Sequence, residues 1–234
     1  MSQTTPNNMA DLFKDPEHAR TYAERPKKIV PGFDGLHRIM AQITAEADPR
    51  AVLVLGGGGG LELKTLIEAL PEARFCAVDP SAEMIAQGRA YLGDPSQVEW
   101  VEGLIFDAPT EMSGGAFDAA TCMLTLHFVA DDGAKLDTLK AVRSRLKPGA
   151  PFFMAHLSVD KADPASEQRF DRYLAFARES QLAPEVLKEA HGRLRNDLNC
   201  VGPERDEALL REAGFSGVEL LFKGMYWCGW VAYA

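Results

Sequence analysis

Five consecutive glycines at residues 56–60 give the chain a place where the backbone can approach a ligand closely. The apolar segment 51–55 before them predicts a short buried strand, and the apolar spacing over residues 61–67 predicts a helix. Glycine has no side chain to obstruct a ligand and adopts positive φ at little steric cost. Asp79 closes the next apolar run, where a carboxylate can accept hydrogen bonds from the hydroxyls of a ribose. Together these features predict a site for a nucleoside-containing cofactor.

The spacing of the glycines distinguishes between kinds of nucleotide-binding turn. The dinucleotide pattern G-x-G-x-x-G needs a glycine where this chain has Leu61 or Glu62, which disfavours an NAD-binding turn. An NAD-linked oxidoreductase is therefore only a runner-up. No Gly-Lys-Ser or Gly-Lys-Thr follows, which disfavours a P-loop. The pattern that fits is G-x-G-x-G at Gly56, Gly58 and Gly60. With this pattern the chain resembles the class I S-adenosylmethionine-dependent methyltransferases.

The resemblance extends through most of residues 50–234. Five segments follow the family's order. They are the turn after the second strand (78–81), the fourth strand (117–128), the turn into the fifth strand (146–155), the last helix with the sixth strand (209–222) and the seventh strand (224–234). The resemblance implies an α/β fold with a Rossmann-like seven-stranded, mostly parallel sheet, an antiparallel last strand and a helical cap. It also implies a methyltransferase that uses S-adenosylmethionine as its cofactor.

The elements that must position these residues follow from alternating apolar segments. Strands are expected near 52–56, 73–79, 97–102, 116–124 and 151–157, with helices near 60–70, 81–92 and 132–146. Short connections between them predict right-handed βαβ units and a parallel sheet covered on both faces. Ligands bind such sheets at the carboxyl ends of the strands. The glycines, Asp79 and the turn at residues 104–105 should therefore meet at one edge.

The chain outside this core predicts further helices. Asp15 and Pro16 are typical of a helix start, and a long insertion carries two amphipathic helical segments joined near Ala183. We expect the insertion to close over the reaction site, although a peripheral pair of helices is the alternative. The expected parts are a disordered tail (1–10), N-terminal helices (11–48), the cofactor-binding core (49–157), the helical cap insertion (158–202), and a C-terminal helix with a β-hairpin (203–234).

The resemblance assigns cofactor contacts to residues at the strand ends. They are Gly56, Gly57, Gly58, Gly60, Asp79, Pro80, Met84, Leu104, Ile105 and Met123. For Asp79 the alternative is a helix N-cap, and for Met84 it is a place in the core. Two positions depart from the family, since Val54 stands where an acidic residue is common, and Leu104 stands where an aspartate commonly holds the adenine amino group.

The chemistry of methyl transfer limits what further residues can be assigned. Displacement at a sulfonium has a good leaving group, so a site can work by aligning and desolvating the reactants without a base. His127 follows the fourth strand and is either a general base or a structural hydrogen-bonding residue. The substrate is expected to contact Phe33, Leu124 and Arg193.

One branch of the family resembles this chain in its layout. The tRNA uridine carboxymethyltransferases share the leading element at residues 30–33 and the long insertion, and they bind a carboxylated cofactor through an arginine. Here Arg193 reaches that position only with a shift in the alignment, because an ungapped match places His191 there. A carboxymethyl-S-adenosylmethionine-using tRNA-modifying enzyme is therefore an alternative function. A non-catalytic S-adenosylmethionine-binding protein is another.

Composition and charge narrow the partners. A net charge of −9 on 234 residues disfavours nucleic acid and makes a small-molecule substrate the better expectation. No apolar stretch approaches the roughly 20 residues that cross a bilayer, and the first residues lack the features of a secretory signal. We therefore expect no membrane association and a cytoplasmic location. The four cysteines are scattered, so no metal site is expected. The oligomeric state stays open, with a homodimer as one option.

Overall fold

A computed structural model of the chain describes residues 25–179 and 192–234. The helices are α3 (Arg25–Ile29), α4 (Phe33–Ala45), α5 (Leu61–Ala69), α6 (Ala82–Leu92), α7 (Ala134–Arg143), α8 (Ser166–Glu179) and α10 (Pro203–Glu212), with short 3-10 helices η1 (Ile105–Asp107) and η2 (Leu126–Phe128). The expected tail at 1–10, the helix start at Asp15 and the junction at Ala183 lie outside the described residues.

The strands form one sheet of seven. They are β1 (Ala51–Leu55), β2 (Arg74–Asp79), β3 (Val98–Glu102), β4 (Ala119–Met123), β5 (Pro151–Leu157), β6 (Ser216–Gly224) and β7 (Trp227–Tyr233). Their order is β3-β2-β1-β4-β5-β7-β6, in which β1 to β5 are parallel and β7 is antiparallel to both of its neighbours. The predicted Rossmann-like sheet with an antiparallel last strand is confirmed. The order reverses beside β1, where β2 and β4 pair with its two edges.

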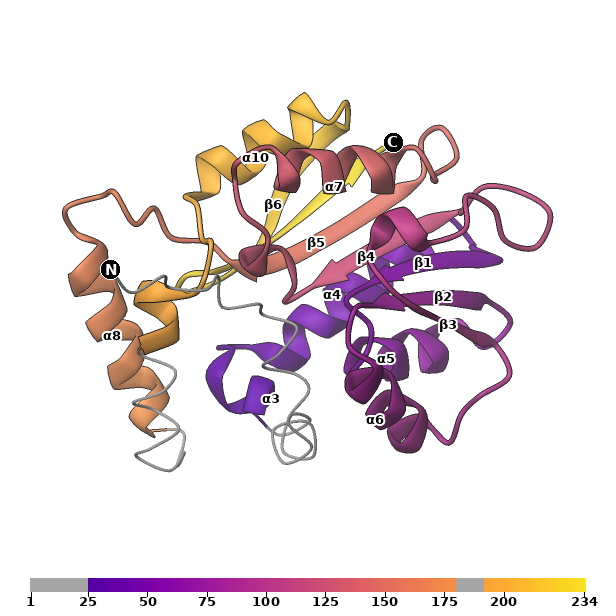
Figure 1. Ribbon diagram of the computed structural model, residues 1–234, viewed down its shortest axis with the longest axis horizontal. Coiled ribbons are helices and arrows are strands. Elements are labelled where there is room, and N and C mark those ends of the chain that lie inside the picture. The colour runs from indigo at the N-terminus through magenta and orange to yellow at the C-terminus, as the bar shows by residue number, and fades with distance from the viewer. Residues whose placement is uncertain (1–24, 180–191) are drawn as a thin grey trace, which may run out of the picture.

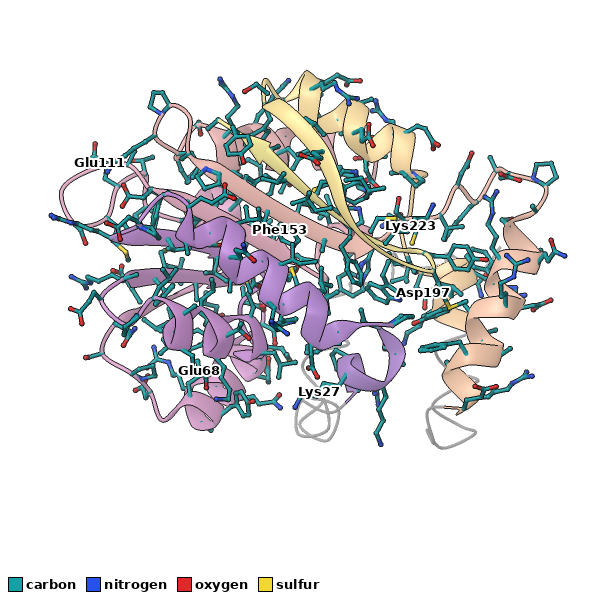
Figure 2. The ribbon with its side chains drawn as sticks, turned by 180° about the vertical axis from the view of Figure 1, so that it is seen from behind. Lys27, Glu68, Glu111, Phe153, Asp197 and Lys223 are labelled. Carbon is teal, nitrogen blue, oxygen red and sulfur yellow. The ribbon has the colours of Figure 1, made fainter. Side chains whose placement is uncertain are left out.

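Helices cover both faces of this sheet. In Figure 1, α7 and α10 lie across one face, whereas Figure 2 shows the opposite face with α4 crossing it beside Phe153. Two apolar clusters result, one holding Leu139 of α7 and Leu209 of α10, the other holding Leu36 of α4 and Leu66 of α5. Strands β1, β4 and β5 are buried along their whole length, as expected for central parallel strands.

The insertion between β5 and α10 is helical in its described part. Helix α8 lies beside α3 (Figure 1), where the Tyr173 hydroxyl donates to the Ile29 carbonyl at 3.1 Å. The Tyr173 ring also packs on Trp227, with 6.4 Å between ring centroids. Residues 192–196 form a further helical turn, whose Arg195 pairs with Glu167 of α8 at 2.6 Å. The insertion is thus fixed to the N-terminal helices at one end of the sheet.

Candidate functional site

The glycine turn (residues 56–60) runs from the carboxyl end of β1 to the start of α5. Gly56 and Gly60 have φ values of 79° and 76°, a region that favours glycine. A Cβ atom on Gly56 would lie 1.9 Å from Oγ1 of Thr125, and one on Gly58 would lie 2.6 Å from Cγ of Asp79. Because no side chain fits at either position, the turn brings bare backbone against the ends of β2 and β4.

Asp79 ends β2 and is tied to the glycine turn. Its Oδ2 accepts a hydrogen bond from the Gly58 backbone N–H at 3.0 Å, and its Oδ1 accepts from the Ser81 N–H at 2.9 Å. The N-cap of α6 is Ser81, whose hydroxyl accepts from the Met84 N–H at 3.1 Å. Burial raises the pKa of Asp79, and the two backbone hydrogen bonds oppose that shift. The carboxyl group is thus held in place and retains lone pairs for a ligand.

The larger cavity at this edge has a volume of about 480 Å³. Its walls come from the carboxyl ends of β1 to β4 and the first turn of α7: Leu55, Gly56, Asp79, Pro80, Ser81, Met84, Gly103, Leu104, Ile105, Phe106, Leu124, Thr125, Leu126, Phe128, Val129, Ala134, Asp137 and Thr138. Among these lining residues, Asp79 and Asp137 carry carboxyl groups and none is Lys, Arg or His. The cavity is therefore mainly apolar, with an acidic character at two points.

A second, smaller cavity of about 20 Å³ also borders the glycine turn. It is lined by Phe33, His37, Gly56, Gly57, Gly59, Gly60, Leu61, Glu62, Met123 and Leu124. The rings of Phe33 and His37 pack with their centroids 4.1 Å apart. Gly56 and Leu124 line both cavities. Leu124 has φ of +55°, a conformation that is uncommon for a leucine and that clusters at functional sites.

The loop after β3 forms the apolar side of the larger cavity. Leu104 and Phe106 are more than half exposed, although both are large apolar residues. Oδ2 of Asp107 accepts from the Leu104 N–H at 2.8 Å, so this carboxyl group folds back on its own loop. From the other side, the buried guanidinium of Arg145 donates to the carbonyls of Phe106 at 3.4 Å and Ala108 at 3.1 Å. The loop is therefore held from two directions.

The structure brings most of the predicted site residues together. The cavities are lined by Gly56, Gly57, Gly60, Asp79, Pro80, Met84, Leu104, Ile105, Met123, Leu124 and Phe33, and Gly58 bonds to Asp79 beneath them. His127 and Arg193 line neither cavity, and neither does any residue of α8.

His127 is 3% exposed, and its Nδ1 accepts a hydrogen bond from the Leu157 N–H at 3.3 Å. Its ring packs edge-on against Trp227, and burial holds its pKa well below the ordinary value. This neutral, packed imidazole joins the ends of β4 and β5. Of the two roles left open by the sequence, the geometry favours structural hydrogen bonding.

Three residues of the site were not identified from the sequence. Glu62 lines the smaller cavity from α5 and is 5% exposed. Gly88 lies inside α6, where an added Cβ would lie 2.2 Å from the Gly58 carbonyl oxygen. The third is Arg145. Two signals of close packing could have found the first two: Glu62 stands between two leucines, and Gly88 stands inside a predicted helix. Nothing in the sequence near Arg145 indicates its contacts.

Comparison with known proteins agrees with this geometry. The family described as a methyltransferase domain matches residues 53–152. The chain is 28% identical over 160 residues to a carboxy-S-adenosyl-L-methionine synthase of Wolinella succinogenes, a match covering 68% of this chain and 65% of that protein. It is 23% identical over 225 residues to a carboxy-S-adenosyl-L-methionine synthase of Klebsiella pneumoniae, covering 92% and 88%.

A solved structure shares the fold. Human N-acetylserotonin methyltransferase, in complex with SAM, superposes with a TM-score of 0.65 at 14% identity, covering 97% of this chain and 59% of that one. The chain thus spans about two thirds of the Wolinella protein and less of the human enzyme. The matched domain and the shared fold both include the glycine turn, Asp79 and the strands that carry them. Residues 53–152 thus match a methyltransferase domain, and the chain as a whole has the fold of a methyltransferase solved with SAM.

Proposed function

We propose that this chain binds S-adenosylmethionine at the carboxyl edge of its sheet and methylates a small molecule. The observation that carries the proposal is the 480 Å³ cavity, which joins Gly56, Asp79 and Leu104 at the point where the strand order reverses. Open α/β sheets bind their ligands in this position. The cavity is large enough for a drug-sized molecule, as ligand sites in general are.

The residues present fit the cofactor. Asp79 would accept hydrogen bonds from the ribose hydroxyls, because its carboxyl group is fixed by Gly58 and Ser81 and faces the cavity. The adenine ring would contact the apolar walls formed by Met84 and Leu104, with Pro80 and Ile105 beside them. The bare backbone of the glycine turn would allow the amino acid portion to approach the end of β1.

When bound, the cofactor supplies an electrophilic methyl group. The chain's own residues then have to align an acceptor and exclude water, which is enough for an in-line displacement. Met123 and Leu124 supply apolar walls at the end of β4, and Phe33 of α4 closes the same side. We propose that His127 supports this wall by joining β4 to β5.

The charges of the larger cavity bear on the substrate. The two carboxyl groups among its lining residues, Asp79 and Asp137, favour a neutral or cationic small molecule over an anionic one. A second candidate function is chemistry on a carboxylated cofactor, which the names of the Wolinella and Klebsiella relatives favour. The acidic lining of the cavity bears on this function as well. A buried carboxylate needs a cationic or hydrogen-bonding partner, and the described lining of the two cavities contains no Lys or Arg.

Calorimetric titration tests the proposal. We expect S-adenosylmethionine and S-adenosylhomocysteine to bind the folded protein, and Asp79→Ala to weaken both by roughly 1–3 kcal/mol through lost hydrogen bonds. Asp94→Asn is the matched control, because Asp94 lies at the far end of α6 and is more than half exposed. Absence of binding by either ligand at millimolar concentration would refute the proposal. Unchanged affinity in Asp79→Ala would refute the ribose role alone.

Mass spectrometry of the nucleoside that co-purifies with the protein separates the two candidate functions. S-adenosylmethionine or S-adenosylhomocysteine supports methyl transfer. A carboxylated derivative of the cofactor supports the alternative suggested by the relatives. Loss of that derivative in Arg193→Ala would further assign the arginine to it.

A further inference from the structure

Glu62 is a buried polar group of the site that the proposed function leaves unexplained. It lies in the first turn of α5 and lines the smaller cavity together with the glycine turn. Its side chain is 5% exposed, and its Oε1 has no hydrogen-bond partner among the described residues. A buried, unpartnered carboxyl oxygen is costly, on the order of 1–3 kcal/mol, and such groups in native proteins call for an explanation.

Another glutamate of the same helix shows that α5 offers a solvated alternative. Glu68, labelled in Figure 2, is 65% exposed and pairs with Lys64 one helical turn away. Helical geometry turns Glu62 toward the sheet instead, beside Thr121 and the backbone amide of Met123 on β4. The carboxyl group thus lies at the junction of β4, α5 and the glycine turn, and a ligand entering the smaller cavity would meet it.

The ionisation of Glu62 is consistent with a site that lacks its partner. Burial raises its pKa to about 8, and the Thr121 hydroxyl and the Met123 amide offset this only in part. The titratable neighbours on the packed elements are His37 of α4 and Cys122 of β4. Burial lowers the pKa of His37 to about 4 and raises that of Cys122 above its ordinary value, so both are neutral near pH 7. Glu62 is therefore the group in this cavity that can change charge when a cation arrives.

We propose that Glu62 binds the α-ammonium group of the amino acid portion of S-adenosylmethionine. This inference rests on the proposed function and adds the residue that holds the polar end of the cofactor. The ammonium would donate to the open Oε1 and would supply the positive charge that a buried carboxylate requires. Glu62 is in this view a binding residue for the cofactor.

Two ligands that differ at the amino acid portion test the assignment. S-adenosylhomocysteine carries the α-ammonium, whereas 5′-methylthioadenosine has the same nucleoside and sulfur without it. We expect Glu62→Gln to weaken S-adenosylhomocysteine binding by about 10- to 100-fold and to change 5′-methylthioadenosine binding by less than about twofold. Glu68→Gln should alter neither affinity, since its side chain is solvated on the same helix.

The outcomes separate this inference from the proposed function. If Glu62→Gln keeps the wild-type affinity for S-adenosylhomocysteine, or if it weakens both ligands equally, Glu62 does not hold the ammonium, while the cofactor site stands. If the wild-type protein binds neither ligand, the proposed function and this assignment both fail.

A measurement on the wild-type protein alone provides a second test. Because the carboxyl group is protonated in the free protein at pH 7 and ionised in the complex, binding of S-adenosylhomocysteine should release about one proton. Titrations in buffers of different ionisation enthalpy count that proton. 5′-Methylthioadenosine should release none, and equal release by the two ligands would overturn the assignment.

Discussion

Glu62 and Asp206 are both buried carboxyl groups, 5% and 1% exposed, yet their surroundings differ. Asp206 lies in the first turn of α10, where its Oδ2 accepts from the Ser158 hydroxyl at 2.6 Å and its Oδ1 lies 3.0 Å from Nε2 of His156. The buried ammonium of Lys135 stabilises it further. Glu62 has a raised pKa and an oxygen without a partner.

The difference separates a structural polar cluster from an open binding group. The cluster around Asp206 joins α10 to the end of β5: its Oδ2 accepts from the Ser158 hydroxyl, and its Oδ1 lies in ion-pair range of His156 Nε2 without a hydrogen bond of good geometry. Glu62 lies on a cavity wall and has acceptor capacity left over. A buried carboxyl group that already has polar and cationic neighbours in the protein holds the fold together, whereas one that lacks a cationic neighbour beside a cavity is available to a ligand.

Removing the carboxyl group of Asp206 should have the largest effect on stability. Asp206→Ala removes one acceptor of the buried Ser158 hydroxyl, the carboxylate beside His156 and the negative charge near the buried Lys135 ammonium. We expect a loss of about 3–5 kcal/mol in the free energy of unfolding. Urea denaturation followed by circular dichroism measures it. Glu207→Ala is the control, because its exposed pair with Arg211 is worth at most about 1 kcal/mol. Equal midpoints for the two variants would show that the cluster does not hold α10.

Neutralising the open carboxyl group should instead stabilise the ligand-free protein. The folded pKa of Glu62, about 8, lies above the ordinary value of 4.5, so the unfolded chain releases its proton first as pH rises. The wild-type protein therefore loses stability between about pH 5 and 8, and Glu62→Gln does not. We expect the variant to gain on the order of 2–4 kcal/mol over the wild type at pH 8 and little at pH 5.

Thermal melts of the ligand-free proteins across this pH range check the prediction. The gain at high pH should accompany a loss of S-adenosylhomocysteine affinity, which is the trade-off expected of a group kept for binding. Glu68→Gln should follow the wild-type pH profile, since its carboxyl group is solvated. A Glu62→Gln profile parallel to that of the wild type would show that Glu62 is not buried as a neutral acid.

The fold could be predicted from the sequence because its signals are local. The segment 151–157 is apolar except for His156 and is β5 in the structure, with the same bounds. Asp79 and the glycine turn could be predicted as one site because both follow strands, and parallel strands bring their carboxyl ends to one edge. Strand β4 is shorter than expected, since Phe117 makes an isolated bridge to Leu146 before the strand begins.

The two buried carboxyl groups could not be predicted, because burial depends on which face of a helix meets the sheet. Asp206 lies in a highly charged stretch, which by itself is typical of a solvated helix. Glu62 alternates with leucines at the start of α5, and only the packing of α5 on β4 turns it inward. Val54, where the family commonly has an acid, pairs in register with Thr121, which is the neighbour of Glu62.

The smallest effect is expected from a change at the backbone of the cofactor edge. The cofactor edge is held by close backbone contacts, and Gly88→Ala would place a methyl group 2.2 Å from the Gly58 carbonyl oxygen. Helix α6 would have to move away from the glycine turn, so we expect a loss of about 1–3 kcal/mol in stability and weaker binding of S-adenosylhomocysteine. Gly35→Ala in α4 is the control, because its Cβ meets nothing within 4 Å and should raise stability by about 0.5–1 kcal/mol. Wild-type stability and affinity in Gly88→Ala would show that the turn tolerates displacement, and that the edge depends on Asp79 rather than on backbone packing.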